Sequence, residues 1–509
     1  MKKYIFVILF LIIAIGAFLR IYRLGDQSLW LDEARSFFRA NQNIHSLWVN
    51  QPKESNPPLY DILFHFYLQL TGSNGELNVR FFSAIIGILL IPLIFFVGKY
   101  MFGARAGLLS SFLVAISPYH IYYSQDAKMY ALLAFLSLGS FFFYYLSLEK
   151  GNNFYWVSYT VTTIALIYSH NMGFLLFLAQ VIIFMVLFRK TRDNLRSFFL
   201  SFLIIAVFLV PRVFCWFWQI SIDANPWLKP ASINDLIQTF SYFSVLSWRI
   251  QISHLVGIAL IICLPIYILV FLNGIFARNE YIDFKVKHFN ELDKLKFVLI
   301  FLFVPLVIAL LVSLKKPIYL AGRYDMFVFP FFCLVIGLGL AKIKRATLRV
   351  VLLVGLTMST VLCLHDYYYV FRKSNDRTVV NYVQSNMNQN DILIFTDLSS
   401  YTFRYYWKQD YVPKMISFPV VDYGWLPRDA LECNDAYTDN EIMKIMGRIK
   451  EVQKKGDLIW LMFVDIPINH RLVEVLKKDY QLNATINFVP GRNNNQVTEV
   501  LIFKSRLLI

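Results

Sequence analysis

The stretch VRFFSAIIGILLIPLIFFVGKYM (residues 79–101) is long and apolar enough to cross a lipid bilayer as one helix, which needs about 20 mostly apolar residues. Other stretches share this character, and together they predict about eleven membrane-spanning helices. The other ranges are 4–20, 104–122, 129–148, 154–170, 172–188, 196–218, 254–276, 296–314, 325–341 and 347–367. The expected fold class is therefore a multi-pass α-helical membrane protein.

The composition of the 509 residues excludes several classes of protein. Hydrophobic residues make up 57% of the chain and charged residues 16%, whereas a soluble domain is nearer half apolar and a quarter charged. The mean hydropathy of +0.52 disfavours both a soluble cytosolic enzyme and a disordered chain. Five cysteines in a chain of this length exclude a disulfide scaffold.

The net charge of +16 lies almost entirely in the apolar part of the chain. Residues 373–509 hold 17 Lys and Arg against 16 Asp and Glu, so residues 1–372 carry +15 of the +16. Basic loops between apolar segments follow the positive-inside rule rather than forming a nucleic-acid-binding face, so we expect no nucleic-acid partner. The bias fits a cytoplasmic N-terminus, and the expected location is the plasma membrane. The apolar run after Met1-Lys2-Lys3 has no convincing small-x-small cleavage site before Arg20 and is followed by further spans, which predicts an uncleaved signal anchor.

The same bias assigns the remaining loops to the two sides of the membrane. The basic loops, including RKTRDNLR (189–196) and KIKRATLR (342–349), are predicted to be cytoplasmic. The predicted outer segments are 21–78, 123–128, 170–171, 219–253, 315–324 and everything from residue 373 onward. The outer side therefore holds most of the isolated carboxylates.

Residues 373–509 are predicted to form a separate extracytoplasmic α/β domain, while residues 1–372 form the membrane module. DILIFTD (391–397), DLIWLMFVD (457–465) and VTEVLIFK (497–504) have the pattern of buried strands. RTVVNYVQSNM (377–387) and NEIMKIMGRIKEVQKK (440–455) show helical periodicity. Helices that alternate with apolar strands are typical of a small α/β domain.

The first outer loop contains two adjacent acids. SLWLDEARSFF (28–38) places Asp32 and Glu33 directly after Trp30. Adjacent carboxylates beside a bilayer are costly to desolvate, but acids also occur at solvated helix N-termini, where they favour the dipole. The pair alone leaves both interpretations open. Further along the loop, NPPLYDILFHF (56–66) predicts a short helix with a rigid proline entry, and this helix carries Tyr60.

The second outer loop, SPYHIYYSQDAKMYAL (117–132), places Asp126 and Lys128 between two predicted spans. Its tyrosines, including Tyr130, fit an aromatic belt at the membrane interface. Asp126 is harder to explain in this way because it is the only acid in the hairpin. Its presence there favours a functional role.

Two further outer loops supply a histidine and a cation. SHNMGF (169–174) carries His170, and a lone histidine at such a place is more often structural than a ligand. KKPIYLAGRYDMFVFPFF (315–332) carries Arg323 and Tyr324. This arginine either extends toward the membrane interface or binds phosphate through its planar fork.

The combination is more informative than each residue alone. Carboxylates, a cation and aromatic rings on one face of a membrane suit an amphiphilic phosphorylated substrate. A carboxylate could remove a proton from an acceptor hydroxyl, and Arg or Lys could stabilise the charge that grows on a departing phosphate. No cofactor is expected, and the eight histidines lack metal-ligand spacing, although Asp32, Glu33 and Asp126 could bind a divalent metal ion.

The chain resembles the GT-C superfamily of integral-membrane glycosyltransferases, in the branch of protein O-mannosyltransferases and lipid A aminoarabinose transferases. The resemblance covers about residues 15–342, and its motifs occur in the family order. These are W-x-DE (30–33), NPPLY (56–60), RFFSAIIG (80–87), SPYH…SQDAKMY (117–130), YSHNMG (168–173) and GRYDM…P (322–330). Members transfer a sugar from a polyprenyl-phosphate donor on the non-cytoplasmic face.

The resemblance implies a role for each matching residue. Asp32 would be the catalytic base, Glu33 an acceptor-side partner and Asp126 the acid of the second loop. Arg323 and Tyr324 would lie near the donor phosphate. Lys128 stands where the branch usually has arginine, which keeps the charge but loses the bidentate fork. The remaining candidate substrate-binding residues are Trp30, Tyr60, Tyr130 and His170.

The predicted function is therefore transfer of a sugar from a polyprenyl-phosphate donor to a lipid, glycan or protein acceptor. A single base and a leaving phosphate predict inversion at the anomeric carbon. A lipid transporter or flippase would also fit the hydropathy, but it should show charged residues near the bilayer midplane or inverted repeats. A non-catalytic receptor would not need Asp32 or Asp126.

Overall fold

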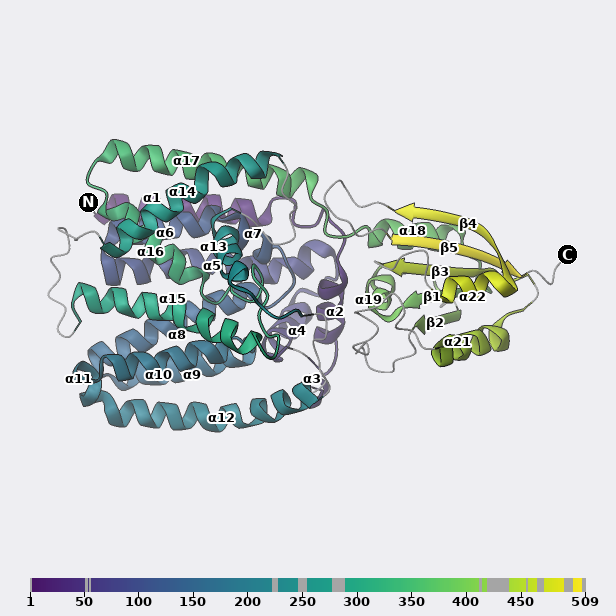
Figure 1. Cartoon of the computed structure of the whole chain (residues 1–509), viewed down its shortest axis with the longest axis horizontal. Helices are drawn as coiled ribbons and strands as arrows, with labels where there is room; N and C mark the ends of the chain where they lie inside the picture. Colours follow the sequence, from purple (N-terminus) through teal and green to yellow (C-terminus); the bar gives the residue numbers. More distant parts are fainter. Residues whose placement is uncertain are drawn as a thin grey trace. The chain divides into compact units, whose positions relative to one another are not determined.

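The computed structural model of the chain divides into two compact units (Figure 1). Unit 1 comprises Met1–Leu24, Gln42–Gln219 and Leu228–Tyr369, and unit 2 comprises Gly25–Asn41, Ile220–Trp227 and Val370–Ile509. The residues that the structure describes are 2–50, 54, 56–221, 228–245, 254–276, 289–411, 414–418, 439–454, 456–464, 471–488 and 498–505. Unit 2 thus joins the segment with the W-x-DE motif to residues that follow the last long apolar helix.

Each of the eleven predicted membrane stretches contains a helix. These helices are α1 (Lys2–Ile21), α5 (Glu76–Phe102), α6 (Ala104–Ile116), α8 (Tyr130–Lys150), α9 (Asn153–Ser169), α10 (Gly173–Val186), α12 (Leu195–Ser221), α14 (His254–Phe276), α15 (Glu291–Ser313), α16 (Phe329–Lys342) and α17 (Ala346–His365). Within the described residues, seven helical stretches are long and apolar enough to cross a membrane. Three further apolar helices, α6, α10 and α16, are shorter.

The predicted span 104–122 is divided in the structure. Helix α6 ends at Ile116, and a second short helix, α7 (Pro118–Ser124), begins at the proline. Proline disfavours the helical conformation of the residue before it, and Ser117 accordingly adopts ψ of 118°. The break gives the start of the second loop a helix of its own, and Asp126 lies in the bend that follows this helix.

Short helices connect the long ones in unit 1. They are α3 (Ile44–Val49), α4 (Leu59–Thr71), α11 (Phe188–Thr191), η2 (Arg192–Asn194) and α13 (Ile233–Ser244). A further short helix, η3 (Asp366–Val370), follows α17. Helix α4 confirms the short helix predicted after Asn56-Pro57-Pro58, because its N-terminal cap is Pro58.

Glycines allow α5 and α6 to approach closely. A Cβ atom added at Gly98 would lie 2.9 Å from the Cα of Gly107, and one added at Gly107 would lie 2.6 Å from the Phe95 carbonyl oxygen. Small residues are typical of helix crossings in membranes. In lipid no hydrophobic effect drives two helices together, so close van der Waals contact between their backbones stabilises the crossing.

Unit 2 contains a five-stranded sheet in the order β2-β1-β3-β5-β4. The strands are β1 (Ile392–Thr396), β2 (Lys414–Phe418), β3 (Ile459–Val464), β4 (Tyr480–Phe488) and β5 (Thr498–Ser505). Strand β1 pairs in parallel with β2 and β3, whereas β5 is antiparallel to β3 and β4. The three predicted strands are confirmed as the three central ones, and β2 and β4 at the edges were not predicted.

The helices of unit 2 are α2 (Leu31–Ala40), α18 (Asp376–Asn386), α19 (Asp397–Tyr406), α21 (Asp439–Val452) and α22 (Arg471–Asp479). Helices α18 and α21 confirm the two predicted ones. Apolar residues of the sheet and of α21 and α22, such as Ile394, Leu461, Ile445 and Leu476, form one buried core.

Candidate functional site

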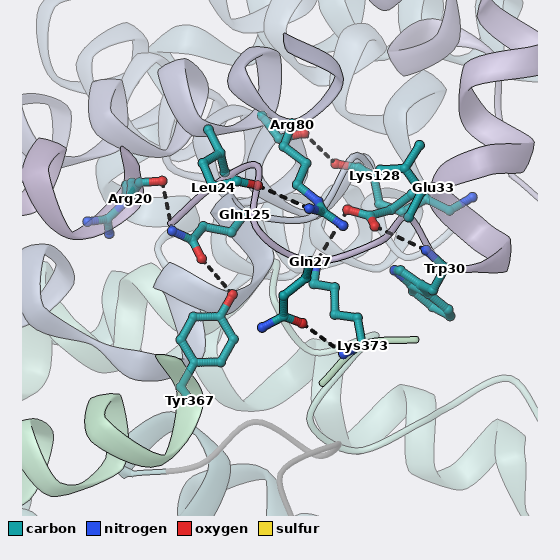
Figure 2. Close-up of polar contacts among 12 residues, drawn as sticks. Arg20, Leu24, Gln27, Trp30, Glu33, Arg80, Gln125, Lys128, Tyr367 and Lys373 are labelled. Carbon is teal, nitrogen blue, oxygen red and sulfur yellow. Dashed lines mark hydrogen bonds and ion pairs between the residues drawn. The ribbon is translucent and has the colours of Figure 1, made fainter. Parts of the chain in front are cut away.

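Gln125 anchors the second loop of the candidate site in unit 1. Its side-chain amide donates hydrogen bonds to the carbonyl oxygens of Arg20 and Tyr22, each at 2.9 Å, and of Leu19 at 3.3 Å. Its carbonyl oxygen accepts a bond from the Tyr367 hydroxyl at 2.7 Å. Figure 2 shows Gln125 bridging Arg20 and Tyr367. The residue before Asp126 is therefore fixed to the C-terminal end of α1.

Arg20 holds the other end of the same loop. Its fully buried guanidinium donates to the backbone carbonyl oxygens of Gly16, Val114 and Ala115 at 2.8–2.9 Å and to the Ser124 hydroxyl at 3.3 Å. A buried charge is tolerated only where hydrogen bonds replace water. These bonds connect α1 to the ends of α6 and α7. Sequence reasoning missed this role, because an arginine that ends an apolar stretch normally indicates the membrane interface.

Asp126 and Lys128 are both buried, with 1% and 7% of their surfaces exposed. The Lys128 carbonyl oxygen accepts a hydrogen bond from the Ser83 hydroxyl at 3.2 Å, and Ser83 in turn lies 2.8 Å from the Tyr60 hydroxyl. Tyr60 on α4 and the second loop are thus linked through Ser83 of α5. The structure brings these three predicted residues into one part of unit 1.

A second group of predicted residues forms a cluster around Arg323. The Arg323 Nε donates a hydrogen bond to the Tyr130 hydroxyl at 2.6 Å, and the guanidinium carbon lies 5.5 Å and 5.9 Å from the ring centroids of Tyr130 and Tyr324. The His170 ring lies 6.0 Å from the Tyr130 ring and 5.2 Å from the Tyr324 ring. Segments far apart in sequence therefore build one cationic and aromatic cluster, which we call the Arg323 cluster.

His170 contributes no positive charge to the Arg323 cluster near neutral pH. Burial, followed by the neighbouring charges of Arg323 and Arg212, lowers the pKa of His170 to about 3. Its Nδ1 accepts a hydrogen bond from the Met172 backbone at 3.1 Å, so the proton of the neutral ring lies on Nε2. Arg323 is thus the cationic member of the cluster.

Asp325 shapes the turn that carries Arg323 and was not among the predicted residues. Its carboxylate is fully buried and accepts hydrogen bonds from the Tyr119 hydroxyl at 2.7 Å, the Gly322 amide at 2.7 Å and the Tyr319 hydroxyl at 3.2 Å. Gly322 adopts φ of +74°, which favours glycine. The sequence signal that could have identified Asp325 is its position directly after the Arg-Tyr pair in GRYDM.

In unit 2, the two acids of the W-x-DE motif have different surroundings. Trp30 caps α2, and its backbone amide donates to the Glu33 carboxylate at 3.4 Å. Glu33 is fully buried and lies 3.2 Å from the Lys373 ammonium (Figure 2). Asp32, one residue earlier in the same turn, is partly exposed. The motif therefore supplies one accessible carboxylate and one paired carboxylate.

The segment before α2 is bound along residues 371–374 of the same unit. The Gln27 side chain accepts from the Lys373 amide at 2.8 Å and donates to the Phe371 carbonyl oxygen at 3.2 Å. The Ser28 hydroxyl donates to the Ser374 carbonyl oxygen at 2.6 Å. These bonds join residues more than 340 positions apart, so local sequence patterns gave no sign of them.

The structure places the predicted residues in three groups, one in unit 2 and two in unit 1. Trp30, Asp32 and Glu33 share the start of α2 in unit 2. Tyr60, Asp126 and Lys128 form the second group, and Tyr130, His170, Arg323 and Tyr324 form the Arg323 cluster. In the part of the chain that the structure describes, no group of three or more His, Cys, Asp or Glu side chains is placed to hold a metal ion.

Part of the chain is similar in sequence to known proteins. The family model for dolichyl-phosphate-mannose-protein mannosyltransferases matches residues 55–218. An uncharacterized protein from Aquifex aeolicus (strain VF5) is 23% identical over 205 residues, which cover 38% of this chain and 40% of that protein. The alignment thus spans about two fifths of the length of this curated relative.

Solved structures share the fold over nearly the whole chain. ArnT from Cupriavidus metallidurans bound to undecaprenyl phosphate aligns with a TM-score of 0.57 at 15% identity, covering 96% of this chain and 97% of ArnT. The oligosaccharyltransferase AglB from Archaeoglobus fulgidus, in complex with an inhibitory peptide and a dolichol-phosphate, aligns with a TM-score of 0.55 at 12% identity. That alignment covers 100% of this chain and 75% of AglB. The chain is thus similar over residues 55–218 to the dolichyl-phosphate-mannose-protein mannosyltransferase family, and it shares its fold with ArnT and AglB.

Proposed function

We propose that the chain transfers a sugar from a polyprenyl-phosphate donor to a lipid, glycan or protein acceptor on the non-cytoplasmic face of the plasma membrane. The fold it shares with ArnT, whose structure contains undecaprenyl phosphate, supports a lipid-phosphate donor. The Lys and Arg bias of the loops supports the non-cytoplasmic side for the motif-bearing segments. Sugars carried by a membrane lipid are available on that side, whereas nucleotide sugars are cytosolic.

The Arg323 cluster is the observation that carries the proposal. Its guanidinium is oriented by Tyr130 and flanked by two tyrosine rings. A planar guanidinium held in one orientation binds phosphate through two parallel hydrogen bonds. Because the cluster is largely buried, its attraction for a departing phosphate is weakly screened. Lys128 is assigned to the donor phosphate as a second, more compact cation.

Asp32 is the proposed general base. It removes a proton from the acceptor hydroxyl while the acceptor oxygen attacks the anomeric carbon of the sugar. The bond from that carbon to the phosphate oxygen breaks, and polyprenyl phosphate leaves with the bonding electrons. The proton remains on Asp32, and one displacement inverts the anomeric centre. Partial exposure supports Asp32 in this role, since the neighbouring Glu33 is buried against Lys373.

The other candidate residues support binding. Trp30, Tyr60 and His170 offer aromatic surfaces for sugar rings or acceptor groups, and Tyr324 lies against Arg323. Asp126 is assigned as the second-loop acid that contacts the substrate. Glu33 is assigned to the acceptor side. Because its own carboxylate is paired with Lys373, it acts by holding α2 in position.

A transfer assay tests the proposal. Full-length protein in vesicles is supplied with a panel of polyprenyl-phosphate sugars and with cell-envelope lipids, glycans and peptides as acceptors. Release of polyprenyl phosphate together with a glycosylated acceptor is expected in wild type and should be strongly reduced in Asp32→Asn. Movement of the intact lipid-linked sugar between leaflets, without cleavage, would instead establish a flippase and contradict the proposal.

A further inference from the structure

The His170 ring is held in one orientation where α9 ends. The His170 amide donates a hydrogen bond to the Leu166 carbonyl oxygen at 3.3 Å, and the His170 carbonyl oxygen accepts one from the Gly173 amide at 2.9 Å. A Cβ atom added at Gly173 would lie 2.6 Å from the Leu166 carbonyl oxygen, so the start of α10 packs closely against this turn. The Met172 amide donates to the ring Nδ1 at 3.1 Å. The backbone of His170 and one of its ring nitrogens are therefore both fixed.

The other ring nitrogen of His170 carries a hydrogen that the chain leaves without an acceptor. Because Nδ1 accepts a hydrogen bond and the ring is neutral, the proton lies on Nε2. The residue is 3% exposed. Its Nε2 is buried, and the residues that the structure describes offer this atom no hydrogen-bond partner. A buried N–H without an acceptor is destabilising, so this one indicates an acceptor that comes from outside the chain.

The surroundings of His170 favour a negatively charged acceptor. His170 and Arg323 lie beside the same two rings, those of Tyr130 and Tyr324. The charges that act on the His170 ring are those of Arg323 and Arg212, and both disfavour an imidazolium. A positive field that keeps the ring neutral also attracts an anion. The Nε2 hydrogen and the Arg323 guanidinium therefore suit the same anionic group.

We propose that the His170 Nε2–H donates a hydrogen bond to a phosphate oxygen of the polyprenyl-phosphate donor. The identity of this ligand rests on the proposed function. The contact gives His170 a role beyond the aromatic surface of its ring, because it makes His170 a neutral partner of the Arg323 cation at the leaving group.

A neutral imidazole suits a departing phosphate. When the bond from the anomeric carbon to the phosphate oxygen breaks, the electron pair stays on that oxygen and the phosphate gains negative charge. The acceptor proton goes to Asp32, and His170 keeps its own proton, since a neutral imidazole is too weak an acid to protonate a phosphate. A hydrogen bond to a charged oxygen strengthens as the charge grows. The Nε2–H thus stabilises the transition state more than the bound donor.

Two substitutions separate the functions of the two ring nitrogens. In His170→Asn, the side-chain oxygen can accept from the Met172 amide as Nδ1 does, but no hydrogen reaches the position of Nε2. In His170→Gln, the longer side chain carries an N–H to about that position. Binding of undecaprenyl phosphate to the full-length protein in nanodiscs is measured by native mass spectrometry. His170→Asn should weaken binding about tenfold or more, as expected for loss of a hydrogen bond to a charged group, whereas His170→Gln should keep most of the affinity.

The exposed His45 of α3 supplies the control, since His45→Asn should bind as wild type does. Unchanged undecaprenyl phosphate affinity in a folded His170→Asn protein would assign the Nε2 hydrogen to an internal water molecule and overturn the inference. Equal losses in His170→Asn and His170→Gln would also overturn it, because they would reflect packing of the ring.

Turnover with several undecaprenyl-phosphate sugars separates this inference from the proposed function. His170→Asn should lower turnover by a similar factor for each sugar, because the contact is with the phosphate that all of them share. A loss confined to one sugar, with undecaprenyl phosphate binding intact, would place the contact on the sugar and overturn the inference. Binding requires no turnover, so a protein that binds undecaprenyl phosphate through His170 and transfers no sugar would contradict the proposed function alone.

Discussion

The Glu33 carboxylate lies 3.2 Å from the Lys373 ammonium, and their side chains are 0% and 3% exposed. The two residues are 340 positions apart, and both belong to unit 2. A second Glu33 contact, from the Trp30 amide, holds the same carboxylate at the start of α2. The ion pair thus fixes the helix turn that presents Asp32, and it distinguishes two neighbouring acids that look equivalent in the sequence.

Loss of this pair should destabilise unit 2. Lys373→Met removes this ammonium from the buried Glu33 carboxylate, and breaking a buried pair typically costs about 3–5 kcal/mol. Thermal unfolding in detergent measures the loss. The matched control is Lys414→Met, which breaks a pair with Asp457 in which the lysine is 27% and the aspartate 8% exposed. This variant should cost less, because the Lys414 side chain is partly solvated. Equal losses for the two variants would show that the Glu33 pair has no special role.

Asp32→Asn should abolish most turnover. The substitution keeps the shape of the side chain and removes the base, and general-base catalysis contributes about 10²–10⁴-fold. Donor binding should persist, because the proposed phosphate contacts come from other residues. Asp26→Asn is the control, since Asp26 is an exposed acid in the same segment. A loss of turnover smaller than about tenfold in Asp32→Asn would fall well short of this range. The base would then lie elsewhere, and Asp126 would become the first candidate.

Arg323→Ala should weaken use of the donor. A charge-assisted phosphate contact is worth about 1.5–3 kcal/mol, so the donor KM should rise at least several-fold in a folded protein. Tyr130→Phe removes the hydroxyl that orients the Arg323 Nε and should give a smaller change in the same direction. Lys315→Ala, an exposed cation in the same predicted loop, should have no effect. Unchanged donor kinetics in Arg323→Ala would instead assign this arginine to the membrane interface.

His170 should make the folded state sensitive to acid. Its folded pKa of about 3 is below the ordinary value of 6.5, so below pH 6.5 the unfolded chain takes up a proton that the folded chain does not. Its contribution to stability is therefore complete above pH 6.5 and is lost progressively as the pH falls toward 3. His170→Gln should flatten this decline in thermal unfolding, whereas His45→Gln, an exposed histidine of α3, should leave it intact. If the melting temperatures of wild type and His170→Gln fall equally with pH, His170 takes up a proton as readily in the folded chain as in the unfolded chain.

The predicted sidedness can be measured by cysteine labelling in intact cells. Cysteines introduced at Lys315 and Lys408 should react with an impermeant reagent, and a cysteine at Arg192 should not. Cys215, Cys263, Cys333 and Cys363 are buried, while Cys433, outside the described residues, is replaced by serine in the background. External labelling at Arg192 would reverse the topology and remove the candidate site from the non-cytoplasmic face.

Local sequence patterns were sufficient for the long helices and the central strands. A bilayer requires about 20 apolar residues in a row, so a stretch such as 79–101 predicts its own helix, which the structure extends to Glu76–Phe102. The strands around Ile394 and Leu461 are buried on both faces and therefore read as continuous apolar stretches. Strand β4 is an edge strand whose burial alternates, and its weaker apolar signal left it unpredicted.

The sequence by itself also determined which residue types are available for chemistry, through motifs such as W-x-DE and GRYDM. Only the tertiary structure decided how they are held: it paired Glu33 with Lys373, buried Arg20 against backbone carbonyls and used Asp325 to shape the turn of Arg323. The physical reason is that helices and strands depend on hydrogen bonds and burial along neighbouring residues, which periodicity records. An ion pair or a buried hydrogen bond depends on which distant segments meet, and no local pattern records that.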